Sequence, residues 1–368
     1  MEREKIKLNT SKTILIAPLD WGLGHATRCM PLIDLLLKHG NKIIIAGNGD
    51  SFYLLKNQYP TLQFYELPGY NISYSIGKNA SFHALMQTPK ILKTIREEQK
   101  AIADIATKEC IDLIISDNRY GVRHPHIKSI IICHQIALQA PKNFRWTNSF
   151  FLALHLKQLR QFDALWIPDE EGDHNLSGIL SHAIDFKMPS SYIGIQSRFA
   201  NFTPATSFVQ NIDFSILVVL SGPEPQRTYL ENLLKLQLAE FPEKILLVQG
   251  KTANFQQTSE KQITTVSYLN TNDLFIALQK AKIIICRSGY STIMDLAALG
   301  KKAILIPSEG QTEQEYLAET LQEKKFTVAC SQNKLDIKAA LEKIESTQGF
   351  PKYVISTIPL EQALGDFL

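Results

Sequence analysis

Short apolar runs recur along the chain and alternate with longer amphipathic stretches. Each run consists of a few Ile, Leu and Val residues without alternating polar positions, which is typical of strands covered on both faces. Between the runs lie stretches of helical length, such as HATRCMPLIDLLLKHG, which ends at Gly40. Strands that alternate with helices predict parallel βαβ units. The predicted strands are TILIAPL from Thr13, KIIIAG from Lys42, DLIISD from Asp112, SIIIC from Ser129, DALWIPD from Asp163, SILVVLSG from Ser215, KILLVQG from Lys244, KIIICRSG from Lys282 and KAILIPS from Lys302.

This pattern restarts near the middle of the chain. After DALWIPD the periodicity weakens, and SILVVLSG begins a new series. A length of 368 residues also fits two domains of ordinary size. We therefore predict an α/β protein with two Rossmann-like, doubly wound parallel-sheet domains. The predicted boundaries are an N-terminal domain over 1–196, a linker over 197–211, a C-terminal domain over 212–350 and a terminal helix in 351–368.

The net charge and the positions of the cysteines limit the partners and the cellular compartment that we expect for this protein. Lys and Arg number 39 against 36 Asp and Glu, a formal net charge of +3. The sequence has no stripe of basic residues interleaved with aromatics, so we expect no nucleic-acid partner. Its five cysteines are dispersed and none has zinc-ligand spacing, which favours a reducing compartment. The polar N-terminal segment and the lack of an apolar run of about 18 residues predict a cytoplasmic protein that does not span a membrane.

Two loops of the first half carry candidate catalytic residues. Ligands of open parallel sheets bind beyond the carboxyl ends of the strands. There, LDWGLGHATR places Gly22 and Gly24 after a strand and His25 in the first turn of a helix, where the dipole disfavours a protonated imidazole. A neutral imidazole suits a general base. Asp117, in LIISDNRYG, would orient that ring or bind an acceptor hydroxyl. The alternatives are a plain strand-to-helix turn and ordinary turn chemistry.

A loop of the second half has the pattern of a diphosphate site. In IICRSGYSTIMDLAALG, Ser288 and Gly289 follow a strand, and Ser288 is a suitable N-cap for a helix from Tyr290. The amide groups of such a helix start suit a diphosphate. Asp295 lies nearly two turns further on the same face, where its carboxylate would reach ribose hydroxyls. The alternative is a solvated Asp in an amphipathic helix.

The next loop, IPSEGQTEQEYLA, has the pattern of a sugar-binding helix start. Thr312 and Glu315 have the spacing of a capping box, which would leave Gln311, Glu313 and Gln314 to face a ligand. Amide side chains donate and accept hydrogen bonds, as sugar hydroxyls require. A merely hydrophilic helix start is the alternative. Since the sequence has no D-x-D pair to hold a metal, we expect helix dipoles and Arg side chains to neutralise phosphates, with no metal or cofactor.

Together these segments resemble the GT-B glycosyltransferases of family 28. The most specific match is CRSGYSTIMDLAALGKKAILIPSEGQTEQEYLA, from Cys286, which is similar to the donor-binding block of that family. The resemblance implies two Rossmann-like domains that face a cleft, with a nucleotide-sugar donor bound by the second. It also implies that Ser288 and Gly289 lie near the donor diphosphate, Asp295 at the ribose and Gln314 at the transferred sugar. Tyr268 and Leu269, in VSYLNTNDLF, fall where the family's backbone recognises uracil. Arg287 and Gln311 are further candidate donor-binding residues.

The first half resembles the family more loosely. GLGHATR is similar to the family's glycine-rich loop ending in His, which implies that His25 is the base. YIGIQSR is similar to the segment that supplies an arginine to the phosphates, which implies that Arg198 has this role. Ser221 and Gly222 begin the loop SGPEPQR, which has prolines where the family usually has glycines. Asp295 replaces the usual Glu, and a position that is often His holds Gly310. These departures leave the transferred sugar open.

The expected activity is an inverting, metal-independent transfer of a hexosyl group from a nucleotide sugar, with UDP as the expected carrier, to an acceptor hydroxyl. Two alternatives keep the fold. GLGHATRC also resembles the His-containing loop of sugar-nucleotide hydrolases, in which His25 would activate water, and nucleotide-sugar epimerases share the GT-B fold. A third alternative is a non-catalytic protein that binds nucleotide sugars.

The sequence leaves the identity of the acceptor undetermined. The segment from Asn143 to Phe162 mixes aromatic residues with Arg145, Lys157 and Arg160. A helix on a membrane surface has this composition, and so has a helix packed on the core with basic ends. The first interpretation predicts a lipid-linked acceptor and a peripheral protein on the inner face of the membrane. The second leaves the acceptor undetermined.

Overall fold

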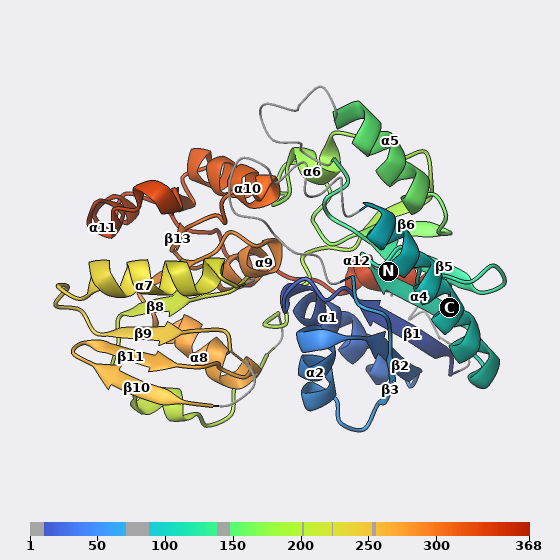
Figure 1. Ribbon diagram of the computed structural model, residues 1–368, viewed down its shortest axis with the longest axis horizontal. Helices are drawn as coiled ribbons and strands as arrows, with labels where there is room; N and C mark the ends of the chain where they lie inside the picture. The colour runs from blue at the N-terminus through green and yellow to red at the C-terminus, as the bar shows by residue number, and fades with distance from the viewer. Residues whose placement is uncertain (1–10, 71–87, 138–147, 201, 223, 252–254) are drawn as a thin grey trace, which may run out of the picture. The chain divides into compact units, whose positions relative to one another are not determined.

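The computed structural model describes residues 11–70, 88–137, 148–200, 202–222, 224–251 and 255–368 (Figure 1). The chain divides into two compact units, Met1–Gln196 together with Ile355–Leu368, and Ser197–Val354. Residues 197–211, expected to form a linker, fall in the second unit by this division. The tail beyond the second unit returns to the first.

The N-terminal unit contains a seven-stranded sheet of order β3-β2-β1-β4-β5-β6-β7, in which all neighbouring strands run parallel. The order reverses between β1 and β4, so the loops after these two strands meet at the carboxyl edge. The strands are β1 Thr13–Pro18, β2 Lys42–Gly47, β3 Gln63–Glu66, β4 Leu113–Asp117, β5 Lys128–Ile132, β6 Ala164–Ile167 and β7 Ser190–Tyr192.

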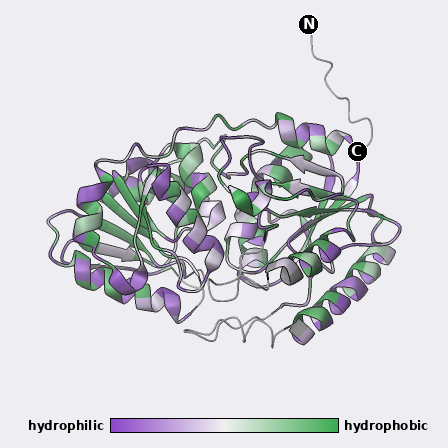
Figure 2. Ribbon diagram, turned by 90° about the horizontal axis from the view of Figure 1, so that it is seen from above, coloured by the Kyte–Doolittle hydropathy of each residue, from purple (hydrophilic) through white to green (hydrophobic). Residues whose placement is uncertain are grey.

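Helices cover both faces of this sheet. Ile14 and Ile16 of β1 pack in one cluster with Ile33, whereas Leu15 packs in another with Ile102. Because successive strand residues point to opposite covered faces, the strand sequences lack polar alternation. In Figure 2 the strands are mostly in the hydrophobic colour, and the helices carry hydrophilic faces. The helices of this unit are α1 Gly24–Lys38, α2 Gly49–Gln58, α4 Thr88–Lys108, α5 Asn148–Leu159, α6 Ile179–His182 and α12 Ile358–Gly365.

The C-terminal unit contains a second seven-stranded sheet, of order β10-β11-β9-β8-β12-β13-β14. Its strands are parallel except for β10, which pairs antiparallel with β11 at the edge. Here the order reverses between β8 and β12. The strands are β8 Ile216–Val219, β9 Ile245–Val248, β10 Gln257–Glu260, β11 Ile263–Val266, β12 Ile283–Cys286, β13 Ala303–Leu305 and β14 Thr327–Ala329.

The helices of the C-terminal unit pack on this sheet in the same manner. Leu230 and Leu234 of α7 and Ile337 of α11 share a buried cluster with strand residues such as Val218. Gly300 ends α9 in the left-handed conformation, with φ of 62°. The helices are α7 Gln226–Leu238, α8 Thr271–Lys280, α9 Tyr290–Leu299, α10 Thr312–Glu323 and α11 Ile337–Ile344, with 3-10 turns η2 Phe208–Asn211 and η3 Gln332–Lys334.

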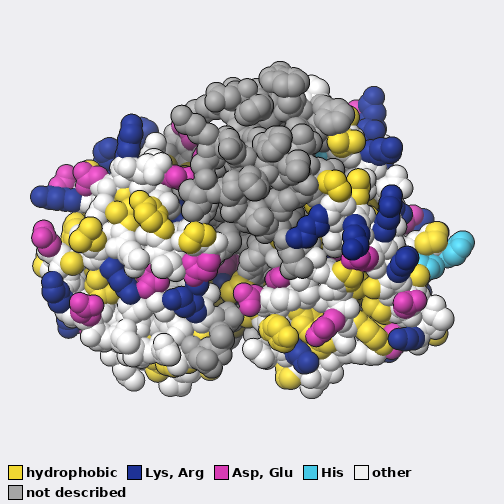
Figure 3. Space-filling model, in the orientation of Figure 1, with side chains coloured by type: hydrophobic (Ala, Val, Ile, Leu, Met, Phe, Trp, Pro, Cys, Tyr) yellow, Lys and Arg dark blue, Asp and Glu magenta, His cyan; other side chains and the backbone are white. Residues whose placement is uncertain are grey.

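The predicted fold class is confirmed: both units are doubly wound α/β sheets, and each of the nine predicted runs forms a strand. The unpredicted strands β3, β7, β10, β11 and β14 are short or polar, and most lie at or near a sheet edge. On the face drawn in Figure 3, basic and acidic side chains are interspersed over each unit. Among the helices that the structure describes, none has the length and apolar composition needed to cross a bilayer.

Candidate active site

In the N-terminal unit, the reversal of strand order brings His25 and Asp117 together. Gly22, with φ of +90°, turns the chain after β1, and α1 begins at Gly24, so His25 lies in its first turn. Asp117 is the last residue of β4, which pairs with β1, where its register partner is Pro18. The imidazole Nδ1 of His25 therefore lies 3.2 Å from Oδ1 of Asp117.

Two residues that the sequence did not single out complete this group. Arg28, one turn beyond His25, donates from Nε to Oδ2 of Asp117 at 2.7 Å, and its Nη2 binds Oδ1 of the same carboxylate. The guanidinium also lies 2.9 Å from Nδ1 of His134 and 2.8 Å from Nδ1 of His25. We call these four residues the His25 cluster. The only sequence signal for Arg28 was its spacing of three from His25 on one helix face.

The charges of the His25 cluster favour a neutral imidazole beside an ionised carboxylate. Burial lowers the pKa of His25, and the Arg28 charge and His134 lower it further, against an opposing effect of Asp117. Burial alone would raise the pKa of Asp117, but the charges of Arg28 and His25 hold it well below its ordinary value. At neutral pH, His25 is therefore available to accept a proton.

In the C-terminal unit, the loop after β12 differs from the prediction at one position. The N-cap of α9 is Gly289 in an extended conformation, and the predicted N-cap Ser288 is wrong. The buried Ser288 hydroxyl instead donates to the carbonyl oxygen of Gln314 at 2.8 Å. Because that hydroxyl is engaged with α10, it ties the two helix starts together and does not cap its own helix.

Arg287 holds three loops of this edge in place. Its guanidinium is buried and donates to the carbonyl oxygens of Ile306 and Pro307, after β13, and of Gln226, at the start of α7. Burial lowers its pKa to about 10, while the charge of Glu309 acts in the opposite direction. These bonds go to backbone atoms of the protein, so the predicted role of Arg287 in donor binding stays a prediction.

The start of α10 is also capped differently from the prediction. Its N-cap is Gln311, so the capping box of Thr312 and Glu315 is wrong. Thr312 is already the first helical residue, and Glu315 instead accepts from the backbone N–H of Gly310 at 3.1 Å. The side-chain amide of Gln314 donates to that of Gln311. The two predicted sugar ligands thus lie together and are partly exposed.

Asp295 and Arg198, predicted at the ribose and the phosphates, bind each other. The Asp295 carboxylate accepts from the Ser197 hydroxyl at 2.7 Å and lies 3.4 Å from Nε of Arg198. The Arg198 guanidinium also lies over the ring of Phe199, 4.9 Å from its centroid. Burial raises the pKa of Asp295, opposed by Arg198 and Ser197. The adjoining cavity, lined in part by Thr292, is about 40 Å³, far below the size of a nucleotide site.

The remaining predicted donor residues lie in loops of the same sheet edge. Ser221 and Gly222 are exposed after β8, and Gly222 has φ of +102°. The carboxylate of Glu224 in that loop accepts from the backbone N–H of Thr228 at 3.2 Å, which caps the first turn of α7. Leu269 follows β11, just before α8. All these loops follow parallel strands, so they gather at one edge.

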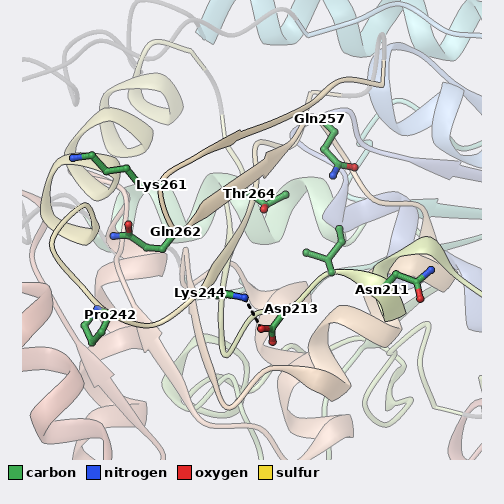
Figure 4. Close-up of a pocket in the computed structure, with 9 residues that line it drawn as sticks. Asn211, Asp213, Pro242, Lys244, Gln257, Lys261, Gln262 and Thr264 are labelled. Carbon is green, nitrogen blue, oxygen red and sulfur yellow. Dashed lines mark hydrogen bonds and ion pairs between the residues drawn. The ribbon is translucent and has the colours of Figure 1, made fainter.

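A polar pocket of about 580 Å³ lies elsewhere in the C-terminal unit (Figure 4). Its lining includes Lys244 and Gln262, which precede β9 and β11, so it opens at the amino ends of these strands. Nζ of Lys244 binds Asp213 at 2.8 Å. This pocket therefore lies at the opposite edge from the predicted donor loops.

The proposed membrane segment is described only in part. Residues 143–147 lie outside the described residues, as do the side chains of Phe150 and Phe151. In the described part of α5, His155 and Leu159 are buried and Leu156 packs on the core, whereas Leu154 is exposed. Within the described ranges, no group of three or more His, Cys, Asp or Glu side chains could hold a metal ion.

The C-terminal unit is similar to a known glycosyltransferase domain. Residues 217–355 match the glycosyltransferase family 28 C-terminal domain. A curated relative is the UDP-N-acetylglucosamine–N-acetylmuramyl-(pentapeptide) pyrophosphoryl-undecaprenol N-acetylglucosamine transferase of Caldanaerobacter subterraneus subsp. tengcongensis, 29% identical over 136 residues. That match covers 34% of this chain and 36% of the relative, so the chain matches little more than a third of the relative's length.

Solved glycosyltransferases share the fold of nearly the whole chain. The glycosyltransferase of kitacinnamycin is 14% identical, with a TM-score of 0.63 over 91% of both chains. SnogD from Streptomyces nogalater is 15% identical, with a TM-score of 0.59 over 96% of this chain and 98% of its own. A Phytolacca americana enzyme complexed with UDP-2fluoro-glucose and pterostilbene is 13% identical, with a TM-score of 0.58 over 96% and 92%. The chain therefore has the GT-B fold of these glycosyltransferases, and its residues 217–355 match the glycosyltransferase family 28 C-terminal domain.

Proposed function

We propose that this protein is a glycosyltransferase that moves a hexosyl group from a UDP-sugar to an acceptor hydroxyl. The observation that carries the proposal is the family 28 match, which spans the loops at Arg287–Gly289 and Gln311–Gln314. The name of the curated relative specifies a UDP-sugar donor, and a structural neighbour was solved with UDP-2fluoro-glucose. Both names support UDP as the carrier.

The donor diphosphate binds at the start of α9. The N-cap Gly289 provides no side chain, and a Cβ built there would meet nothing nearer than Oγ1 of Thr292 at 4.0 Å. Backbone and phosphate can therefore approach closely, and the helix dipole favours the negative charge. A metal-independent reaction follows if this helix start and Arg198 supply the positive charge that the leaving diphosphate needs. The ribose reaches Asp295 when its hydroxyls replace the bonds from Ser197 and Arg198.

The acceptor is activated by His25. Its Nε2 takes the proton from the acceptor hydroxyl while Nδ1–H donates to Asp117, which stabilises the imidazolium that forms. The acceptor oxygen forms a bond to the anomeric carbon as the bond from that carbon to the diphosphate oxygen breaks. A single displacement of this kind inverts the anomeric centre. The low pKa of Asp117 supports this role, because the carboxylate stays ionised.

Hydrolysis is the second candidate, because the His25 cluster would activate a water molecule in the same way as an acceptor hydroxyl. Incubating the protein with UDP-sugar alone separates the two reactions. A transferase releases little free sugar until an acceptor is added, whereas rapid release from the donor alone supports the hydrolase.

The acceptor is first to be sought among lipid-linked molecules, because the name of the curated relative specifies a pyrophosphoryl-undecaprenol acceptor. A protein that meets such an acceptor at the inner face of a membrane should float with anionic vesicles and stay in the dense fraction with neutral ones. Failure to float with either would contradict a peripheral membrane protein.

Nucleotide binding and the base are tested separately. UDP should raise the melting temperature, because a ligand of the native state alone stabilises it, while ADP, GDP and CDP should have little effect. His25→Ala should abolish transfer, by about 10²-fold or more, and leave the UDP shift intact. A chain that UDP does not stabilise, or a His25→Ala variant with normal turnover, contradicts the respective part of the proposal.

A further inference from the structure

The His25 cluster contains a buried arginine that the proposed reaction does not use. Arg28 is 3% exposed and occupies both oxygens of the Asp117 carboxylate, which is itself fully buried. A simple pair of His and Asp would leave these oxygens to the imidazole. The guanidinium thus contacts both the predicted base and the carboxylate that would orient it.

Arg28 and Asp117 compete for one atom of the imidazole. Nη2 of Arg28 lies 2.8 Å from Nδ1 of His25, and Oδ1 of Asp117 lies 3.2 Å from the same nitrogen. The guanidinium only donates, and the ionised carboxylate only accepts. If Nδ1 accepts from Arg28, the proton of the neutral ring must sit on Nε2. If Nδ1 donates to Asp117, Nε2 keeps its lone pair.

The same geometry controls the charge of His25. A buried carboxylate beside an imidazole stabilises the protonated ring, and a protonated ring cannot act as a base. Arg28 balances that carboxylate and repels a proton on His25. The other titratable groups near this point are His134, 2.9 Å from Nη1 of Arg28, Cys29, whose Sγ lies 3.6 Å from Oδ2 of Asp117, and the buried Cys133. The two thiols cannot replace Arg28, because a thiol carries no positive charge.

We propose that Arg28 is a positioning residue that sets both the charge and the tautomer of His25. At rest it donates to Nδ1, so the ring is neutral with its proton on Nε2. The ring becomes a base when Nδ1 carries the proton and donates to Asp117, a change that moves one proton between the ring nitrogens through solvent and leaves the ring uncharged. This inference rests on the proposed function, in which His25 is the base.

The test is the titration of His25 by nitrogen-15 NMR on the full chain, with its signals assigned by their loss in His25→Gln. In the wild type we expect a pKa below 6.5, the ordinary value, with Nε2 protonated and Nδ1 not, in the neutral ring. A neutral wild-type ring with the proton on Nδ1 overturns the proposal without any variant.

Variants of Arg28 separate charge from geometry. Arg28→Gln should raise the pKa of His25 by about one to three units, because Asp117 is then unbalanced, and should move the ring proton to Nδ1. The double variant Arg28→Gln with Asp117→Asn removes both charges and should return the pKa toward the wild-type value. Arg28→Lys keeps the charge without the planar fork, so it should keep the pKa low and still release Nδ1. An unchanged titration in Arg28→Gln contradicts the proposal.

The result can be told apart from a failure of the proposed function. The NMR measurements need no turnover, so a shifted titration in a protein without transferase activity retains the Arg28 role and rejects only the reaction. If the chain does transfer sugar, the acid limb of the pH profile of kcat/KM should move upward in Arg28→Gln by the same amount as the pKa. Should Arg28→Gln fail to fold, Arg28→Lys and the charge-balanced double variant still decide the matter.

Discussion

Several buried charged side chains lie at the carboxyl edges of the two sheets, and they differ in the groups that bind them. Glu98 and Arg119 are both fully buried, and Glu98 also accepts from the Tyr70 hydroxyl and the backbone N–H of Gly121. We infer that this fully hydrogen-bonded ion pair has a structural role. Removing one partner would lower the free energy of unfolding by about 3–5 kcal/mol. The His25 cluster differs, because its carboxylate lies within reach of both the Arg28 guanidinium and the His25 imidazole.

Variants at and beside Asp295 can separate its structural role from its proposed role in ribose binding. Asp295→Asn should weaken UDP binding about tenfold, since a ribose hydroxyl then loses a charged acceptor. Ser197→Ala removes the bond at 2.7 Å that a ribose hydroxyl is proposed to replace, and it keeps the Asp295 carboxylate. This variant should lower the free energy of unfolding by about 1–2 kcal/mol and should not weaken UDP binding, because the ribose then has no protein hydroxyl to displace. Calorimetric titration with UDP is the measurement, and equal effects of the two variants would point to a structural role alone.

His155 should make the stability of the protein depend on pH. Burial lowers its pKa to about 4, and a backbone hydrogen bond of Ile136 opposes the shift. Between pH 6.5 and about 4 the unfolded chain binds a proton that the folded chain does not, so stability falls as the pH falls. From pH 7 to 5 this contribution should reach about 2 kcal/mol.

Urea unfolding at the two pH values measures this effect in the wild type and in His155→Gln. The glutamine amide can still meet the Tyr120 hydroxyl, which lies 3.0 Å from Nε2 of His155, but it does not titrate. The variant should lose about 2 kcal/mol less than the wild type on acidification. An identical loss in both proteins would mean that His155 does not titrate in this way.

At the scale of elements, the starts of α9 and α10 form one connected structure. The Ser288 hydroxyl binds the Gln314 backbone, and Arg287 binds the loop before α10 and the start of α7. We expect helix starts fixed to one another in this way to keep their geometry when a ligand binds. Preorganised donors of this kind stabilise a leaving diphosphate more effectively than donors that must first be ordered.

Gly289 tests where the diphosphate sits. Its φ of −70° is open to any residue, and an added Cβ would find space, so Gly289→Ala should change the free energy of unfolding by less than about 1 kcal/mol. The new methyl group would stand where backbone and phosphate are proposed to meet. UDP affinity should therefore fall about tenfold or more, as measured by calorimetry, while the melting temperature without ligand stays near that of the wild type. Unaltered affinity would move the diphosphate to another loop.

At the scale of the whole molecule, the chain leaves the second unit and ends on the first. Leu360, Ala363 and Leu364 of α12 are buried in the same cluster as Ile14 and Ile33, and Phe367 meets the ring of Trp166. The last residues therefore complete a core whose other members come from the first 193 residues. Each unit keeps its own hydrophobic clusters, so the two need not unfold together.

Leu364→Ala tests this arrangement. The Leu364 side chain is 1% exposed, so truncating it should lower the free energy of unfolding by about 2–4 kcal/mol. Hydrogen exchange should locate the lost protection in residues of the N-terminal unit, such as those of β1 and α1, and spare the C-terminal unit. Val354→Ala is the matched control, because Val354 is 92% exposed and should alter neither unit. Loss of protection confined to the C-terminal unit would contradict the assignment of α12.

The sequence by itself determined nine strands, which lie inside the two sheets, and the order of the chain through them. Runs such as LIIS before Asp117 predict a strand because only a strand covered on both faces dispenses with polar positions. It also located His25 and Asp117 after two strands, and the resemblance located the donor loops. These signals are local in the chain, and so a single sequence contains them.

Only the tertiary structure decided which side chains form hydrogen bonds and ion pairs with one another. Arg28 meets Asp117 across 89 positions of sequence, and Ser197 meets Asp295 across 98, and no local pattern predicts such pairs. The cap of α9 was mispredicted for the same reason, because the Ser288 hydroxyl has a partner on another helix. Hydrogen-bond partners depend on which loops the sheet brings to one edge, and that is fixed when the strands pair.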